Sequence, residues 1–362
     1  MWMLLSVIFV LFAESAMASC PLIIAHRGSS GFRPEHTLAA YDLAISQGAD
    51  FIEVDVVSTR DGVLVARHEN ELSDTTDVAT RPEFADRKTK KVVDGKGRSG
   101  WFSEDFSLQE LKRLRAIERM PTLRPESQGF DRQFPIPTLE EVIDLVRQAS
   151  RTRGTDVGLY IETKHPTYFR SLGLALEDVL TKVLARHHYR EGHDPVFLES
   201  FEPSSLRTLQ RLSRLRLVQL LGGPGDRPYD LVHQGDSRTT NDLLSPAGLS
   251  EIAQYAAVVG ISKEWFNQSD DSKIEHVSAT LIRELHQRGL QVHVWTFRNE
   301  NYFLPETLRT GNRHDGEFPR QWGNALHEYQ RYFQLHVEGV LSDFPATARQ
   351  ALVEYQKKEA CP

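Results

Sequence analysis

The chain has no excess of basic residues. Among its 362 residues, Asp and Glu outnumber Lys and Arg by 50 to 43, which gives a formal net charge of −7. Non-specific binding to nucleic acid or to anionic lipid requires a basic surface, so this balance argues against both partners. With 40% hydrophobic residues, 26% charged residues and no low-complexity tract, the sequence predicts a globular protein of one large domain or two modest ones.

The apolar run at residues 2–12 is too short to span a bilayer. Ala16-Met17-Ala18 follows it with the small-x-small pattern of a signal-peptide cleavage site. We therefore expect residues 1–18 to be a secretory signal and the protein to be exported, either periplasmic or secreted. No Lys or Arg precedes Arg27, so the usual basic n-region is missing, and a buried N-terminal helix is the alternative.

Cysteine is nearly absent, since the sequence has only Cys20 and Cys361. If the barrel argued below forms, its first strand begins and its last helix ends at the same face. The two sulfurs could then come within disulfide distance, and export would permit the bond. The alternative is lipid attachment at Cys20, but Met17 stands where lipoprotein signals usually carry Leu. The disulfide is favoured.

Short β-branched runs alternate with helix-length stretches along the rest of the chain. Eight strands are expected, at residues 22–25, 51–55, 157–162, 196–199, 216–221, 257–261, 291–295 and 338–341, with helical patterns such as 37–47, 174–186, 250–255 and 279–288 between them. This alternation over roughly 340 residues predicts an α/β fold, a TIM (β/α)8 barrel with insertions. A doubly wound open sheet is the alternative, but no Gly-rich dinucleotide fingerprint follows the first strand.

Two stretches do not fit this alternation. Residues 69–137 carry charged runs, a Gly-rich segment and one helix-like piece, and predict a small insertion over the barrel mouth. Residues 305–323 are polar and rich in Gly, Arg and Asn, and predict a surface loop. We therefore expect residues 19–362 to form a single barrel domain with one insertion.

Carboxylates occur where buried strands should be apolar. Residues two apart share a face of a strand, so Glu53 and Asp55 point together, as do Glu162 and Lys164. An unpaired buried charge loses several kcal/mol of solvation, and a divalent ion bound by carboxylate oxygens offsets this loss. We expect Glu53, Asp55 and Glu162 to bind one divalent cation, Ca²⁺ or Mg²⁺.

A further β-like run at residues 63–67 is separated from the second strand by Arg60-Asp61-Gly62. Asp-Gly between alternating hydrophobic residues predicts a two-residue hairpin turn. Centred on these two residues, the turn would pair Asp55 with His68 and place His68 beside the carboxylates.

His26 and Arg27 directly follow the first predicted strand and precede a turn that is rich in glycine and serine. In a TIM barrel, functional residues gather at the C-terminal ends of the strands. Arg27 and Lys164 can hold the non-bridging oxygens of a phosphate, while His26 and His68 supply one proton donor and one acceptor. Phosphodiester cleavage needs these groups.

Seven short motifs occur in order: His26-Arg27-Gly28, Pro34-Glu35-His36-Thr37, Glu53-Val54-Asp55, His68, Glu162-x-Lys164, Trp295-Thr296 and Ser342-Asp343-Phe344-Pro345. Together they resemble the glycerophosphodiester phosphodiesterase family, in the form of its exported bacterial members. The resemblance covers residues 22–347 and is interrupted by the insertion.

The resemblance implies a TIM barrel in which His26 and His68 act as general acid and base on a glycerophosphodiester such as glycerophosphocholine or glycerophosphoethanolamine. It implies that a hydroxyl of the substrate's own glycerol attacks phosphorus, and that water then opens the cyclic phosphate to glycerol 3-phosphate. The other implied residues are Glu53, Asp55 and Glu162 on the metal and Arg27 and Lys164 on the phosphate.

Five positions near these motifs have weaker assignments. Many family members have Asn at the position of His36 and Asp at that of Glu69, and we expect neither departure to touch a proposed ligand. Trp295 could stack on the substrate, although plain barrel packing explains it equally well. Asp343 is interpreted as the N-cap of the last helix. Glu35 either supports the metal site or favours the start of a helix.

Two other functions stay open. A phospholipase-type phosphodiesterase acting on intact lipid would need an apolar rim or a basic patch, and the insertion is too polar for the former. A non-catalytic binding protein would lack one of the two histidines or three carboxylates, and all five are present. We therefore expect an enzyme that acts on a small soluble substrate, with no nucleic-acid partner and no stable membrane insertion.

Overall fold

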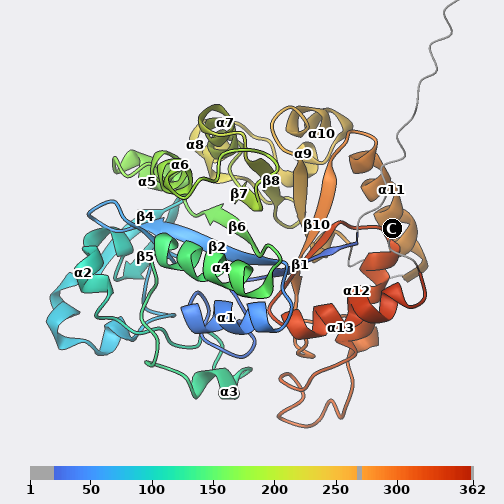
Figure 1. Ribbon diagram of the computed structural model, residues 1–362, viewed down its shortest axis with the longest axis horizontal. Helices are drawn as coiled ribbons and strands as arrows, with labels where there is room; N and C mark the ends of the chain where they lie inside the picture. The colour runs from blue at the N-terminus through green and yellow to red at the C-terminus, as the bar shows by residue number, and fades with distance from the viewer. Residues whose placement is uncertain (1–19, 267–270, 360–362) are drawn as a thin grey trace, which may run out of the picture.

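The computed structural model describes residues 20–266 and 271–359, and its centre is a closed barrel of eight parallel strands (Figure 1). The barrel strands are β1 (Leu22–Ala25), β2 (Phe51–Ser58), β6 (Gly158–Thr163), β7 (Val196–Ser200), β8 (Arg216–Leu221), β9 (Val258–Ser262), β10 (Gln291–Phe297) and β11 (Gly339–Ser342). Strand β1 pairs with both β2 and β11, which closes the ring. The predicted TIM barrel is confirmed, and an open sheet is excluded.

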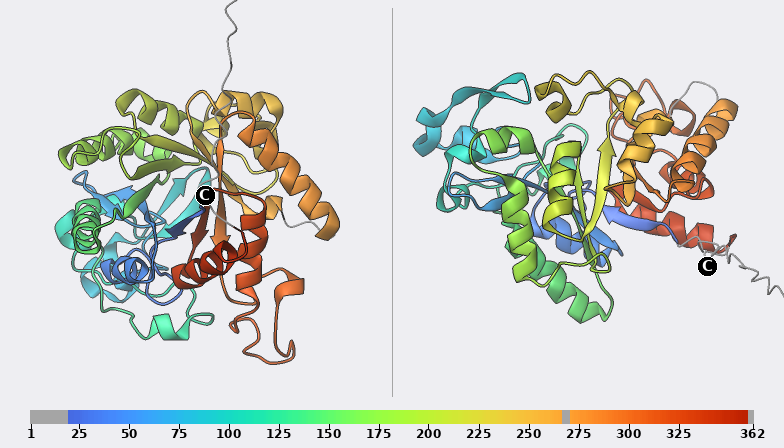
Figure 2. Two further views of the ribbon diagram at one scale, coloured as in Figure 1. Left: turned by 45° about the vertical axis from the view of Figure 1, so that its right-hand side comes forward. Right: turned by 90° about the horizontal axis from the view of Figure 1, so that it is seen from above.

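Helices surround the barrel, as the left view of Figure 2 shows. They are α1 (Leu38–Ser46), α4 (Leu139–Arg153), α5 (Pro166–Ser171), α6 (Leu176–Arg186), α7 (Pro203–Leu212), α8 (Tyr229–His233), α9 (Thr240–Leu243), α10 (Pro246–Ile252), α11 (Asp271–His286), α12 (Ala325–Gln334) and α13 (Pro345–Gln356). Within the described ranges, no helix combines the length and the apolar character needed to cross a bilayer.

The predicted signal, residues 1–18, and Cys361 lie outside the described residues, so the signal and the disulfide stay predictions. Cys20 lies two residues before β1, and its Sγ is 3.0 Å from Nε2 of Gln356 at the end of α13. The first strand therefore begins beside the end of the last helix.

The barrel strands are apolar on the outside and divided into two layers on the inside. Outward side chains such as Ile52 and Val54 pack against the helices in the main core. The lower interior is filled by Ile24, Phe51, Tyr160, Phe197, Val218, Leu220, Val258 and Leu341. Glycine makes room for the larger of these side chains, because a Cβ at Gly158 would lie 2.1 Å from the Phe51 ring. The upper interior, at the C-terminal ends of the strands, is the barrel mouth and carries the polar residues.

Outside the barrel, three strands and two short helices lie between β2 and α4: β3 (Leu64–Ala66), β4 (Thr89–Val93), β5 (Lys96–Gly100), α2 (Leu108–Leu111) and α3 (Pro125–Gln128). Residues 67–138 form the insertion, which packs against one side of the barrel (Figure 1, cyan). The tip of its β4–β5 hairpin reaches the mouth, since Lys96 and Arg98 line a cavity there together with Lys164. Residues 305–323 are a surface loop with one 3₁₀ turn.

The β2–β3 hairpin differs by one residue from the predicted register. Ala66 faces Val56, whereas a two-residue turn at Asp61-Gly62 would place it opposite Val57. The turn has three residues, because the amide of Thr59 donates to the carbonyl of Val63 at 3.0 Å and Gly62 closes the turn at φ 78°. The prediction of a two-residue turn was wrong, since an Asp-Gly pair also suits a turn that ends in a left-handed glycine.

The shifted register still brings His68 to the mouth. The amide of Arg67 donates to the carbonyl of Asp55 at 3.0 Å, which holds the chain beside β2 after β3 has ended. His68 follows immediately and lines the cavity at the mouth. The predicted proximity of His68 to the carboxylates is therefore correct, although the pairing from which it was inferred is not.

His293 of β10 lies fully buried in the barrel, and its Nδ1 is 2.8 Å from the Tyr160 hydroxyl. Burial, with a smaller contribution from Arg216, lowers the pKa of His293 to about 3. An unfolded histidine takes up a proton below about pH 6.5, whereas the folded protein resists this proton until about pH 3. His293 therefore favours unfolding progressively as the pH falls through this window.

In His293→Gln, the free energy of unfolding should depend less steeply on pH between about pH 6 and pH 4. The slope should fall by about 1.4 kcal/mol per pH unit, because unfolding no longer takes up the proton of His293. Urea unfolding at a series of pH values measures this slope. His193→Gln is the control, since the side chain of His193 is 84% exposed. A slope that is equal in wild type and His293→Gln would contradict the linkage.

Candidate active site

Four carboxylates meet inside the barrel mouth. Glu53 and Asp55 come from β2, Glu162 from β6 and Glu199 from β7, and none is more than 6% exposed. The strand register places Asp55 beside Glu162, and Glu162 beside Glu199. Single oxygens of Glu53, Glu162 and Glu199 lie within 4.8 Å of one another. The three predicted metal ligands are thus neighbours, and Glu199 joins them.

The sequence interpretation did not include Glu199, although a signal for it was present. It ends the apolar run Val196-Phe197-Leu198, just as Glu162 ends the apolar run on the preceding strand. Two-residue periodicity puts Glu199 on the face of Phe197, which points into the barrel. An acidic residue at the inner end of a third barrel strand could have been added to the site on this ground.

The electrostatics of the cluster differ from one carboxylate to the next. Burial and repulsion from neighbouring carboxylates raise the pKa of Glu53 and of Glu199 well above the usual range. Burial is also the main cause that raises the pKa of Glu162, to about 8, against the attraction of Lys164. Although burial opposes it, Lys164 and nearby histidines hold the pKa of Asp55 well below normal.

Such a cluster fits a divalent cation. Buried oxygens of Asp55 (Oδ1) and Glu199 (Oε2) have no hydrogen-bond partner among the described residues. A hard cation with oxygen ligands would satisfy both atoms and relieve the repulsion that otherwise favours protonation of the glutamates. The set contains oxygen ligands only, which suits Ca²⁺ or Mg²⁺ better than zinc.

His26 leaves β1 at the mouth, and its Nδ1 lies 2.6 Å from Oδ1 of Asp343. Burial, followed by the charge of Arg27, lowers the pKa of His26 to about 4. The interpretation of Asp343 as a helix cap was wrong, because Phe344 occupies the N-cap of α13 and makes no capping bond. The carboxylate instead holds one nitrogen of His26 and leaves the other for the cavity.

His68 has the same arrangement beside β2, the strand that pairs with β1. Its Nδ1 lies 2.5 Å from Oε1 of Glu69. Burial, then the charges of Arg27 and Lys164, lower its pKa to about 3. Both histidines are thus backed by a carboxylate at Nδ1, which fixes the tautomer that presents Nε2 to a substrate.

Two cations stand between the histidines and the carboxylates. Lys164 Nζ lies 2.9 Å from Oε1 of Glu162. Arg27 places Nη1 3.2 Å from Glu35 and Nε 3.6 Å from Asp55, and its Nε donates to none of the described residues. Both side chains also line the cavity at the mouth, where their charges favour an anion.

The cavity at the mouth has a volume of about 390 Å³. Seven of the eight predicted residues line it: His26, Arg27, Glu53, His68, Glu162, Lys164 and Trp295. The eighth, Asp55, lies behind them. Trp295 packs edge-on against Phe201 at 5.7 Å, and its buried Nε1 has no partner among the described residues, so it can donate to a ligand.

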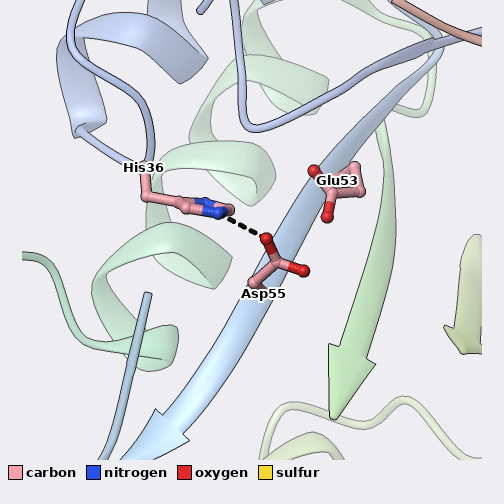
Figure 3. A group of neighbouring side chains, drawn as sticks. All are labelled: His36, Glu53 and Asp55. Atoms are coloured by element: carbon pink, nitrogen blue, oxygen red, sulfur yellow. Dashed lines mark hydrogen bonds and ion pairs between the residues drawn. The ribbon is translucent and has the colours of Figure 1, made fainter. Parts of the chain in front are cut away.

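His36, in the segment before α1, points toward Asp55, and Figure 3 shows the hydrogen bond between them. Its Nε2 lies 2.8 Å from Oδ2 of Asp55, and its Nδ1 lies 2.7 Å from the Tyr41 hydroxyl. The residue that distinguishes this chain from many family members therefore bonds directly to a predicted metal ligand, and the expectation that this departure touches no proposed ligand was wrong. Glu35 lies before Thr37, the N-cap of α1, and outside the first turn of that helix, and its carboxylate pairs with Arg27 and Arg119.

A parallel barrel that carries two carboxylate-backed histidines, two cations and an acidic cluster at one mouth defines a TIM-barrel phosphodiesterase. Comparison with known proteins specifies the class. The model of the "Glycerophosphoryl diester phosphodiesterase family" matches residues 26–347. The chain belongs to this family and is an enzyme.

Relatives of the chain carry the same name. A glycerophosphodiester phosphodiesterase of Arabidopsis thaliana is 35% identical over 298 residues, which are 79% of this chain and 77% of the relative. One from Haemophilus influenzae is 29% identical over 353 residues, or 92% of this chain and 90% of the relative.

Solved structures share the fold. An Oleispira antarctica phosphodiesterase in complex with the product sn-glycerol-3-phosphate has a TM-score of 0.60 and 22% identity, and the match covers 92% of this chain and 97% of that one. A glycerophosphodiester phosphodiesterase from Agrobacterium tumefaciens has a TM-score of 0.55 and 18% identity, with 91% and 99% covered.

Glu162→Gln and Glu199→Gln should each weaken binding of Ca²⁺ or Mg²⁺ by about tenfold or more, because each removes a charged oxygen from the cluster. Isothermal titration calorimetry measures the affinity. Glu202→Gln is the matched control, since Glu202 is buried nearby but its carboxylate accepts hydrogen bonds from Thr167. Unchanged affinity in Glu199→Gln beside weakened affinity in Glu162→Gln would remove Glu199 from the ligand set.

Proposed function

We propose that the protein hydrolyses small glycerophosphodiesters, such as glycerophosphocholine and glycerophosphoethanolamine, to glycerol 3-phosphate and an alcohol. One observation carries the proposal: His26 and His68 line one cavity, and each has Nδ1 held by a carboxylate. A pair of proton-transfer groups around a phosphate-sized site is what diester cleavage requires. The family membership supports the same substrate class.

The reaction has two steps. In the first, one histidine accepts the proton of the glycerol 2-hydroxyl while its oxygen bonds to phosphorus, and the other histidine protonates the departing alcohol oxygen. The product is a cyclic glycerol phosphate. In the second, water loses a proton to the histidine that acted as acid and attacks phosphorus, and the ring bond to the 2-oxygen breaks as that oxygen regains its proton.

The charged groups of the cavity support this chemistry. Arg27 and Lys164 bind non-bridging phosphate oxygens, and Trp295 contacts the substrate at the mouth. A divalent cation held by Glu53, Asp55, Glu162 and Glu199 would neutralise the negative charge that develops on phosphorus oxygens.

Substrate binding also favours protonation of the histidine that acts as the acid. Apart from burial, the fields of Arg27 and Lys164 depress the pKa of His68, and Arg27 does the same at His26. A bound phosphate anion offsets these fields, so its arrival favours the protonated form of the histidine that serves as acid.

Purified protein should release glycerol 3-phosphate from glycerophosphocholine, lose this activity in a chelator, and regain it with Ca²⁺ or Mg²⁺. A coupled enzymatic assay for glycerol 3-phosphate measures the release. Absence of release with either ion would overturn the proposed substrate class.

In the same assay, His26→Ala and His68→Ala should each lose at least about a hundredfold in kcat, since each removes a proton-transfer group. Both should bind the metal normally, because neither is a ligand. His193→Ala provides a histidine control on the surface.

A substrate analogue without the glycerol 2-hydroxyl should bind as a competitive inhibitor and resist cleavage, because the nucleophile is missing. Product analysis by phosphorus NMR after long incubation tests this. With the natural substrate, the same method should detect a cyclic phosphate before glycerol 3-phosphate. Cleavage of the analogue at a normal rate would show that water attacks directly.

A further inference from the structure

The insertion sends two arginines to the catalytic end of the barrel. Arg119 and Arg124 lie five positions apart, just before α3, and neither belongs to a barrel strand. Each guanidinium meets the carboxylate that holds one of the two histidines. The insertion is therefore connected to both proton-transfer groups, His26 and His68, through one arginine and one carboxylate each.

Arg119 binds two carboxylates at once. Its Nη1 and Nη2 donate to the two oxygens of Glu69 at 2.9 and 2.6 Å, and its Nε and Nη2 donate to those of Glu35 at 2.8 and 2.7 Å. Oε1 of Glu69 is also the atom that meets Nδ1 of His68. A planar guanidinium with paired bonds fixes the plane of a carboxylate as well as its position.

Arg124 acts on the other histidine and is only 4% exposed. Its Nη2 donates to Oδ2 of Asp343 at 2.6 Å, and Nε of Arg298, at the end of β10, donates to the same oxygen at 2.8 Å. Oδ1 of Asp343 meets His26. Nε of Arg124 donates to Glu300 at 2.7 Å and its Nη1 to the carbonyl of Ser30 at 3.0 Å. Every nitrogen of the guanidinium is thus anchored.

The segment that carries both arginines is itself braced. The buried carboxylate of Glu118 accepts hydrogen bonds from the Met120 amide at 2.8 Å and from the Ser127 hydroxyl at 2.5 Å. The amide of Arg124 donates to the carbonyl of Met120 at 2.9 Å. The positions of the two guanidinium groups are therefore fixed relative to each other.

We propose that Arg119 and Arg124 are positioning residues that orient His68 and His26 through Glu69 and Asp343, so that one segment of the insertion sets both proton-transfer groups. The inference rests on the acid and base roles proposed above for the two histidines. A carboxylate held only by a histidine can turn with the ring, whereas one that is also held by arginine cannot. A misplacement of about 1 Å at a reacting group lowers the rate by about a hundredfold.

Arg124→Met is the cleaner test. It leaves Asp343 with one arginine donor, Nε of Arg298, in place of two. Its kcat should fall about 10- to 100-fold, while KM for glycerophosphocholine and affinity for Ca²⁺ stay at wild-type values. Arg119→Met should show a similar fall in kcat, together with a rise in KM, because it also releases Glu35, a partner of Arg27. Arg87→Met is the control, since Arg87 pairs with Glu110 inside the insertion at 2.5 Å, away from Glu69 and Asp343.

Two further measurements separate positioning from stability. In Arg124→Met/Glu300→Gln, the carboxylate charge left buried by the first change is removed, so the melting temperature should recover while kcat stays low. In ¹⁵N-histidine NMR spectra, assigned with the two alanine variants, the Nδ1 signal of His26 should shift in Arg124→Met and that of His68 should not.

The outcomes are distinct. If both methionine variants keep kcat within about twofold of wild type, the positioning role is wrong and the proposed function stands. If the double variant recovers kcat along with its melting temperature, Arg124 contributes only buried charge, which also overturns the inference. If His26→Ala and His68→Ala keep their activity, it is the proposed function that fails.

Discussion

Mutual repulsion among four buried carboxylates is the constraint on which the rest of the mouth depends. Glu53, Asp55, Glu162 and Glu199 are placed together by the strand register, and burial denies them the solvent that would screen their charges. Lys164 and Arg27 offset only part of this charge. The remaining negative charge favours either a bound divalent cation or protonated carboxylates. Asp55 and Glu199 each have an oxygen without a hydrogen-bond partner in the described part of the chain, which favours the cation. The apolar lower interior of the barrel and the outer helices hold the strands in the register that brings these carboxylates together.

Around the four carboxylates, the side chains of the mouth alternate in charge with distance from the cluster. The histidines contact carboxylates, and those carboxylates contact arginines, so each proton-transfer group belongs to a chain of opposite charges rather than to a single pair. The two positions at which this chain departs from many of its relatives belong to this arrangement: His36 bonds to Asp55 and Glu69 bonds to His68. A longer Glu in place of Asp is compatible with a partner such as Arg119, which approaches from the insertion.

The strands and most of the site could be predicted from the sequence because both follow local rules. Two-residue periodicity placed Glu53 with Asp55, and strand order around a barrel placed their neighbours. The hairpin register could not be fixed, since Asp61-Gly62 suits turns of two or three residues. Asp343 was misassigned because a residue before Phe-Pro also suits a helix start, and its contact with His26 joins positions 317 apart in the sequence. The insertion has no hydrophobic periodicity, so the contacts of Arg119 with Glu69 and of Arg124 with Asp343 could not be predicted.

The closure of the barrel between its first and last strands has a consequence for the order of assembly. Until β11 docks, β1 lacks a partner on one side and His26 lacks Asp343. Loop closure over such a separation is slow, and the unpaired edges of β1 and β10 are open to wrong partners in the meantime. Helices and the first half of the sheet can form well before this event. Catalytic competence is therefore a property of the completed ring, because His26 and Asp343 meet only when β1 and β11 are paired.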